Sequence, residues 1–148
     1  MISAIVSALH VLALALGLPA VFFRARALKG PLDGPGLARL FVADNVWGIA
    51  ALLWVATGLA RALGGLEKGT DFYLASPLFW LKMALFATMG LLEVWPMVTL
   101  IRWRRALRQG KVPDTRAAPR LYVISHAEMG LVIIIVFVAS FMARAFGL

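Results

Sequence analysis

Apolar residues gather in four long runs, which are separated by polar connections that contain most of the arginines. The runs cover residues 2–23, 43–63, 78–103 and 121–143. Each has about 20 residues or more, and a helix of that length crosses the roughly 30 Å hydrocarbon core of a bilayer. The pattern predicts an all-α integral membrane protein of one domain, residues 1–148. Because the links are short, its four transmembrane helices are expected to form an antiparallel up-and-down bundle.

Turn and capping residues indicate where these helices begin and end. The pair Gly64-Gly65 is expected to end the second helix, and Ser76-Pro77 is expected to open the third. Asp44 is expected in the first turn of the second helix, where a carboxylate favours the helix dipole. Residues 37–42 before it either form a short interfacial turn or begin that helix.

The composition agrees with a membrane protein. Hydrophobic residues make up 62% of the chain and the mean hydropathy is +0.89, whereas a soluble domain is roughly half apolar. The chain has no cysteine. This excludes disulfides, zinc fingers, iron–sulfur clusters and thiol redox chemistry.

Positive charge, +8 in total, is concentrated in two of the three connections. The basic residues around the first and third connections are Arg24, Arg26, Lys29, Arg39, Arg102, Arg104, Arg105, Arg108, Lys111, Arg116 and Arg120. The second connection is nearly neutral and contains Arg61, Glu67, Lys68 and Asp71. Because basic loops stay in the cytoplasm, both termini are expected on the non-cytoplasmic side. We expect the arginines to contact anionic lipid headgroups rather than nucleic acid.

Helical periodicity places polar residues at two levels within the membrane. The outer level contains His10 and Lys82, with Arg61 near its edge. His10 lies about 12 Å below the outer boundary at the helical rise per residue, within side-chain reach of the depth of Lys82. An anionic or metal-containing ligand would complete this set. The structural alternative is that His10 bonds a backbone carbonyl and Lys82 extends to the interface.

The inner polar level contains Arg24, Asp44, Glu93, His126 and Glu128. Acids and bases are both present, so these residues either form ion pairs that fix helix packing or act as a relay. His126 and Glu128 are separated by about 200° around a helix, so they cannot both face a narrow core. One of them is expected to meet a second subunit or the headgroups, which favours a homo-oligomer or a larger complex.

The outer level fits b-type haem, because imidazole in an apolar bundle is a common axial ligand of haem iron. His10 is the candidate iron ligand, and Lys82 or His126 is the candidate second ligand. The residues expected to line a slot for the porphyrin are Trp47, Trp54, Phe86 and Met89. Lys82 or Arg61 would pair with the propionates.

Copper is the competing metal. Its candidate ligands are Met83, Met89, Met97 and Met129 together with the two histidines, because soft ligands suit Cu(I). The sequence has no glycine-rich phosphate loop, serine elbow or HExxH motif. Hydrolytic and nucleotide-dependent mechanisms are therefore not supported.

Five elements distributed along the chain point to a known family. They are Ala8-Leu9-His10, Asp44-Asn45-Val46-Trp47-Gly48, Glu67-Lys68-Gly69-Thr70-Asp71-Phe72-Tyr73, Glu93-Val94-Trp95-Pro96-Met97 and Met142-Ala143-Arg144. Over essentially its full length the chain resembles the bacterial membrane protein family called domain of unknown function 2214. The resemblance implies a multi-pass protein of the bacterial inner membrane and assigns no function.

Two further elements are Ala8-Leu9-His10-Val11 and Phe79-Trp80-Leu81-Lys82-Met83. Through them the chain more distantly resembles HemJ-type protoporphyrinogen oxidases, which are four-helix membrane proteins that bind haem b, and the copper-resistance D membrane domain. This resemblance implies haem binding at His10 and Lys82. The chain departs from the HemJ pattern after Pro19, where no arginine follows directly, and in Glu93 and His126. The departures put the oxidase activity in doubt more than the haem fold.

The sequence thus predicts a haem b protein with a redox role, either electron transfer with quinone or porphyrinogen oxidation. Whether it is an enzyme, a haem-dependent membrane oxidoreductase, stays open. One alternative is a non-enzymatic subunit or assembly factor of a larger membrane complex. Another is a metal or small-solute transporter that uses Glu93, His126 and Glu128 as a relay.

Overall fold

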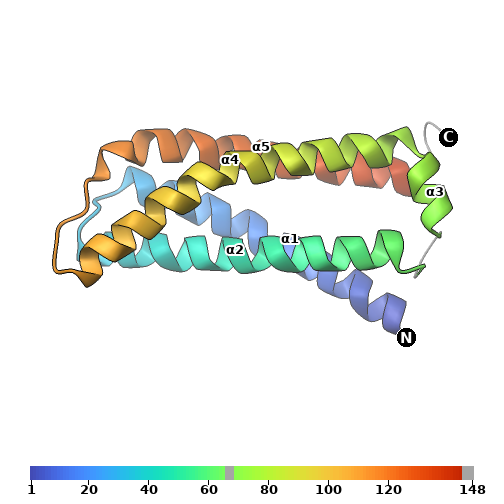
Figure 1. The fold of residues 1–148 in the computed structure, drawn as a ribbon, viewed down its shortest axis with the longest axis horizontal. Helices are drawn as coiled ribbons and strands as arrows, with labels where there is room; N and C mark the ends of the chain where they lie inside the picture. The colour runs from blue at the N-terminus through green and yellow to red at the C-terminus, as the bar shows by residue number, and fades with distance from the viewer. Residues whose placement is uncertain (66–68, 145–148) are drawn as a thin grey trace.

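Four long helices form an antiparallel bundle in the computed structural model, which describes residues 1–65 and 69–144 (Figure 1). The elements are α1 (Ile2–Lys29), α2 (Gly34–Leu63), α3 (Thr70–Ala75), α4 (Pro77–Arg108), the 3-10 helix η1 (Thr115–Ala117) and α5 (Ala118–Ala143). Four helices are long and apolar enough to cross a membrane. The predicted all-α membrane fold is therefore confirmed. Glu67 and Lys68 of the second connection lie outside the described residues.

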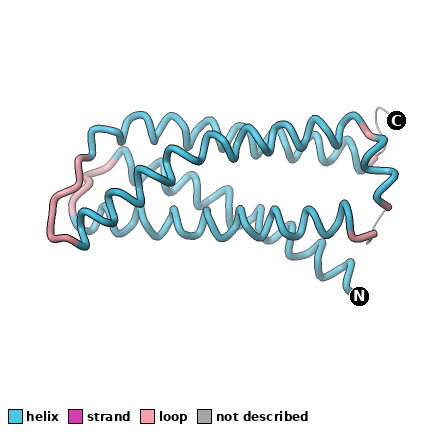
Figure 2. The backbone as a smooth tube through the Cα atoms, in the orientation of Figure 1, coloured by secondary structure: helices cyan, strands magenta, loops and turns pink. Residues whose placement is uncertain are grey.

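The four long helices pack against one another in the order α2, α1, α5, α4. Close backbone contacts join α2 to α1, α1 to α5 and α5 to α4, whereas α2 and α4 are not among these pairs. The N-terminus and the last turn of α5 lie at the end of the bundle that carries α3 (Figure 1). The α1–α2 loop and the α4–η1 loop lie together at the opposite end, as the backbone trace shows (Figure 2).

The helix α2 begins at Gly34, nine residues before the predicted span of residues 43–63, so residues 37–42 belong to this helix, which was one of the two alternatives. Its N-cap is Asp33, whose carboxylate accepts a hydrogen bond of 2.8 Å from the backbone N–H of Gly36. A Cβ atom at Gly36 would come within 1.9 Å of the carbonyl oxygen of Pro31, so this tight entry requires glycine. Asp44 is consequently inside the helix, and its placement in the first turn was wrong.

The ends predicted at Gly64-Gly65 and Ser76-Pro77 agree with the structure, whereas α1 and α4 extend beyond the predicted residues 23 and 103. Gly64 is the C-cap of α2, and α4 begins at Pro77 with Ser76 at the N-cap position. The sequence did not predict α3, a helix of six residues between them. Its Tyr73 side chain is buried, so this short helix closes one end of the bundle.

An apolar layer divides the interior of the bundle into two polar regions. This layer is the buried cluster of Ala13, Ala20, Val21, Trp47, Trp54, Met89, Val132 and Ile135. His10 lies on one side of it and Arg24 on the other; 14 residues of α1 separate them, or about 21 Å of helix. Large apolar side chains such as Leu52 and Leu91 cover the outer surface, as expected for helices that face lipid.

Candidate functional site

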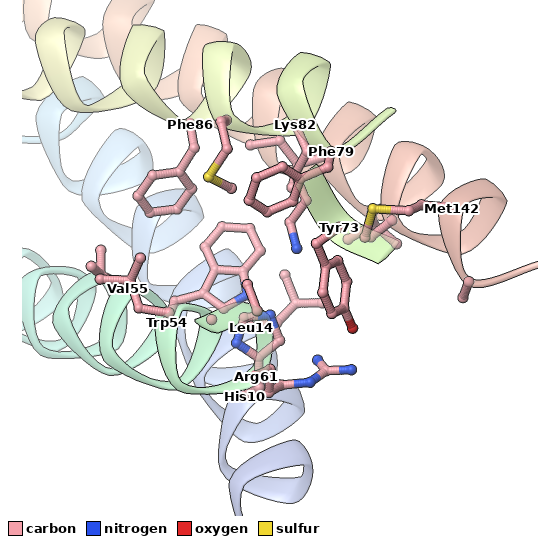
Figure 3. A pocket seen from close by; sticks show the side chains of 18 of the residues that line it. His10, Leu14, Trp54, Val55, Arg61, Tyr73, Phe79, Lys82, Phe86 and Met142 are labelled. Atoms are coloured by element: carbon pink, nitrogen blue, oxygen red, sulfur yellow. The ribbon is translucent and has the colours of Figure 1, made fainter. Parts of the chain in front are cut away.

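A cavity of about 370 Å³ opens at the α3 end of the bundle (Figure 3). This lies within the roughly 300–1,000 Å³ typical of small-molecule sites. Its walls come from α1, α2, α3, α4 and α5. Five of the lining residues are aromatic: Trp54, Phe72, Tyr73, Phe79 and Phe86. The cavity thus has the volume of a small-molecule site, and its aromatic side chains offer ring faces to an organic ligand.

His10 is the histidine of this cavity, and a hydrogen bond fixes its ring. Its Nδ1 lies 2.8 Å from the hydroxyl oxygen of Thr57. That hydroxyl donates its proton to the carbonyl oxygen of Leu53 at 2.6 Å, so it accepts from the imidazole. Nδ1 is therefore the proton donor of this hydrogen bond, and in a neutral ring the lone pair lies on Nε2. This is the arrangement of a metal-binding histidine with a second-shell partner.

Close packing also restricts the position of the His10 ring. A Cβ atom at Gly58 would lie 3.3 Å from His10 Cε1, so the glycine makes room for the imidazole against α2. The ring centroid is 5.9 Å from that of Trp54. Trp54 in turn meets Phe86 edge to face at 5.5 Å. The imidazole is consequently held at an aromatic wall that α2 and α4 build together.

Two basic side chains line the same cavity. Arg61 reaches it from α2 beside His10, and Lys82 extends into it from α4 on the other side (Figure 3). No aspartate or glutamate lines the cavity among the residues that the structure describes. A carboxylate-bearing ligand in this cavity would therefore lie beside two cations.

The structure brings together five of the seven residues predicted to bind a cofactor. His10, Trp54, Arg61, Lys82 and Phe86 line the cavity. Two others, Trp47 and Met89, are buried in the apolar layer and do not line the cavity.

Several lining residues escaped the sequence analysis, among them Tyr73, Phe79 and Met142. The orienting residue Thr57 was also missed. It follows Trp54 by three positions, so the helical period that selected Trp54 could have selected it too.

A protein-only metal site is less well supported. The described residues contain no group of three His, Cys, Asp or Glu side chains that could hold a metal ion. Met83 lines the cavity with His10, but Met89, Met97 and Met129 do not. Met97 is 48% exposed on the surface of α4. The methionines proposed for copper therefore do not gather around one point.

A buried ion cluster occupies the other polar region, and Arg24 is its centre. Arg24 is 1% exposed and donates from Nε to the hydroxyl of Ser125 at 3.1 Å. One terminal nitrogen donates to both carboxylate oxygens of Glu93, at 2.8 and 3.0 Å, and to Asp44 at 3.2 Å. The other terminal nitrogen donates to Glu128. One guanidinium thus joins α1 to the other three long helices.

A second arginine joins this cluster near the end of α4. Arg104 donates to Asp44 at 2.8 Å, to the side chain of Asn45 at 2.9 Å and to the carbonyl oxygen of Phe41 at 3.3 Å. From the sequence, Arg104 is expected among the basic residues around the third connection. Because α4 continues to Arg108, Arg104 instead lies within the helix and ties it to α2.

His126 does not belong to the cluster, which corrects its inclusion in the inner polar level. Its side chain is exposed, and its Nδ1 lies 3.0 Å from the carbonyl oxygen of Tyr122 in the preceding turn. Glu128 takes the inward position on α5, where it is 0% exposed. His126 is also absent from the cavity, where α5 contributes residues from Ile135 onward, so it cannot be a second ligand beside His10.

The comparisons with known proteins point to one family. A family model described as "Predicted membrane protein (DUF2214)" matches residues 2–147, which is nearly the whole chain. No curated protein and no solved structure matched the chain.

Proposed function

We propose that this chain, which belongs to the DUF2214 family of membrane proteins, binds haem b in the cavity at the α3 end. His10 is the iron ligand. Lys82 is the second ligand or, with Arg61, a partner of the propionates. The role that follows is redox, either electron transfer with a quinone or oxidation of a porphyrinogen.

The orientation of His10 is the observation that carries this proposal. The bond from Nδ1–H to Thr57 leaves the lone pair on Nε2, the atom that most often coordinates metal. Thr57 is itself buried, so the bond is shielded from competing water.

The other walls supply what a porphyrin requires besides its axial ligand. Trp54, Phe79 and Phe86 offer flat apolar surface, and Arg61 and Lys82 offer positive charge for two carboxylates. Haem in such a pocket supplies one-electron redox chemistry, whose potential depends on the axial ligand and on burial. The protein's own contribution is to fix His10, exclude water and hold the acidic groups.

We also propose an orientation in the bacterial inner membrane. The loop end of the bundle carries the basic residues Arg26, Lys29, Arg105, Arg108 and Lys111, so it faces the cytoplasm. The cavity and both termini then lie on the non-cytoplasmic side. A quinone or porphyrin would reach the cavity from the lipid or from that side.

Visible spectroscopy of the purified protein tests the proposal. The full chain is produced with a haem supply, and its oxidised and reduced spectra are recorded with pyridine haemochrome quantitation. We expect a b-type spectrum at about one haem per chain. His10→Ala should abolish the bound haem while far-ultraviolet circular dichroism shows unchanged helix content.

The chain offers a matched control in its second histidine. His126→Ala removes an imidazole that lies on the surface of α5, away from the cavity, and should keep the full haem content. A colourless wild-type protein that stays colourless after haem addition would contradict the proposal. Equal haem content in the His10 and His126 variants would contradict the assignment of the ligand.

A further inference from the structure

The ion cluster around Arg24 contains more carboxylates than cations. Its acids are Asp44 from α2, Glu93 from α4 and Glu128 from α5. Its cations are Arg24 from α1 and Arg104 from α4. The remaining polar groups that face it are the hydroxyl of Ser125 and the indole of Trp47, which are neutral. With every group ionised, the cluster would carry one unbalanced negative charge.

The hydrogen bonds show where this imbalance lies. Five of the six carboxylate oxygens accept from an arginine: both of Asp44, both of Glu93 and Oε2 of Glu128. The sixth, Oε1 of Glu128, is buried and has no hydrogen-bond partner. Glu128 is 0% exposed, so no bulk water reaches this oxygen either.

An ionised carboxylate with a bare oxygen is unfavourable in this position. Burying a charge without a compensating partner costs so much that such groups usually become neutral instead. The cost is greatest within a membrane, where there is no water to solvate the orphaned oxygen. A proton on Oε1 removes the surplus charge and leaves Oε2 bonded to Arg24.

We infer that the cluster is an intramembrane proton-binding site and that the proton resides on Oε1 of Glu128. The ligand class is a proton, held because two arginines balance only two of three carboxylates. The site is independent of the proposed haem cavity, because the apolar layer lies between them. It assigns Glu128 a proton in addition to its place in helix packing.

Infrared spectroscopy of the full chain in nanodiscs detects this proton directly. At neutral pH exposed carboxyl groups are ionised, so a carbonyl band of protonated carboxylic acid reports a buried acid. We expect such a band in the wild type, equivalent to one carboxyl group per chain, with the usual shift in D2O. Glu128→Gln should abolish it and keep the helix content, because glutamine resembles the neutral acid in shape and charge.

A second variant tests the charge balance without touching either glutamate. Asp44→Asn removes one anion, so Arg24 and Arg104 then balance Glu93 and Glu128 without a proton. The acid band should disappear although Glu128 is still present. Asp114→Asn is the matched control, because Asp114 is an exposed acid of the third connection, and the band should be unchanged.

Three results would overturn the inference. A wild type without an acid band at neutral pH would show that the cluster is fully ionised. A band that persists in Glu128→Gln would place the proton elsewhere. A band that persists in Asp44→Asn would show that local burial, not the charge of the cluster, holds it. Because the Asp44 variant is informative by itself, the test survives if the Glu128 variant fails to fold.

Discussion

The two polar regions of α1 differ in how their polar groups are arranged, because one is a buried ion cluster and the other borders a cavity. Arg24 uses all three of its nitrogens on four partners from three other helices. His10 has its Nδ1 anchored at Thr57, and the rest of its ring borders a cavity of about 370 Å³. Polar residues inside a membrane are costly in both cases. We therefore expect the ion cluster to contribute to cohesion, whereas the region beside the cavity has room for a ligand.

The difference extends to the surroundings. The Arg24 cluster lies where four helices converge, and its groups attract each other directly. In the cavity the basic groups Arg61 and Lys82 come from separate helices, and no acid among the described residues lines the walls with them. The first region is therefore expected to govern folding and the second to govern ligand binding. Four predictions separate these roles.

The largest effect is expected from Arg24→Leu. The change removes the cation shared by three buried carboxylates, and breaking a buried pair in this way typically costs roughly 3–5 kcal/mol. We expect most of the protein to aggregate on extraction, or to unfold at a much lower temperature in detergent. Thermal unfolding followed by circular dichroism measures the effect.

The control for this variant is two residues away on the same helix. Arg26 is exposed, so Arg26→Leu should leave the unfolding temperature nearly unchanged. A folded Arg24→Leu protein of wild-type stability would show that the cluster contributes little to cohesion. The contrast between the two regions would then be lost.

The second prediction concerns the cavity and is made with Thr57→Val. The change keeps the shape of the side chain but removes the hydroxyl that orients His10. Loss of such a second-shell bond usually lowers metal affinity by about 10–100-fold. We expect weaker haem binding of this order in an absorbance titration, with unchanged helix content.

Thr88→Val is the matched control for this variant. Thr88 on α4 donates to the carbonyl oxygen of Ala84 on its own helix at 2.9 Å and lies on the exposed surface. Its replacement should leave haem affinity unchanged. Equal affinities for the Thr57 and Thr88 variants would mean that the hydroxyl does not prepare the ligand.

The third prediction tests the tie between α2 and α4. Arg104→Gln removes a charged hydrogen bond to Asp44, and such bonds contribute about 1.5–3 kcal/mol. The Arg104 side chain is 25% exposed, so water partly screens the bond. We therefore expect the free energy of unfolding to fall by an amount near the lower end of that range. Arg105→Gln is the control, because Arg105 is the exposed neighbour of Arg104 and should tolerate the change. Unfolding in a denaturant series measures both variants. Equal midpoints would mean that the bond between Arg104 and Asp44 does not stabilise the fold.

The sequence was sufficient for the four spans because length and hydropathy decide them directly. It also selected Arg24, Asp44, Glu93 and Glu128, since charges within apolar runs are rare enough to be grouped by depth. It could not choose between Glu128 and His126. The helix α5 is apolar on all sides, so its pattern does not say which face turns inward, and only packing against α1 and α4 fixes that rotation.

The start of α2 illustrates a different limit. Asp44 resembles a capping residue in isolation. Asp33, followed by Pro35 and Gly36, is a stronger N-cap signal, and the helix that it starts has ten residues before Asp44. In the cavity, His10 and Lys82 were found by depth. Tyr73 was not, because it belongs to a short helix of a connection whose path the apolar pattern does not describe. Local sequence signals thus identified the polar residues of the membrane spans. They did not identify residues whose position depends on tertiary packing.

The smallest effect is expected from Asp114→Asn at the loop end, outside both regions. Asp114 accepts from the side chain of Arg116 at 2.7 and 3.0 Å and from its backbone N–H at 3.1 Å. These bonds hold the pKa of Asp114 at about 2, below its ordinary value of 3.8. Because the folded pKa is the lower one, the ion pair stabilises the fold above pH 3.8 and loses this effect as the pH falls to about 2. Both side chains are largely exposed, so water and salt screen the pair. Unfolding temperatures of the variant and the wild type should therefore nearly coincide at neutral pH and converge fully at about pH 2. A loss at neutral pH as large as that of Arg24→Leu would mean that burial does not decide which ion pairs matter in this bundle.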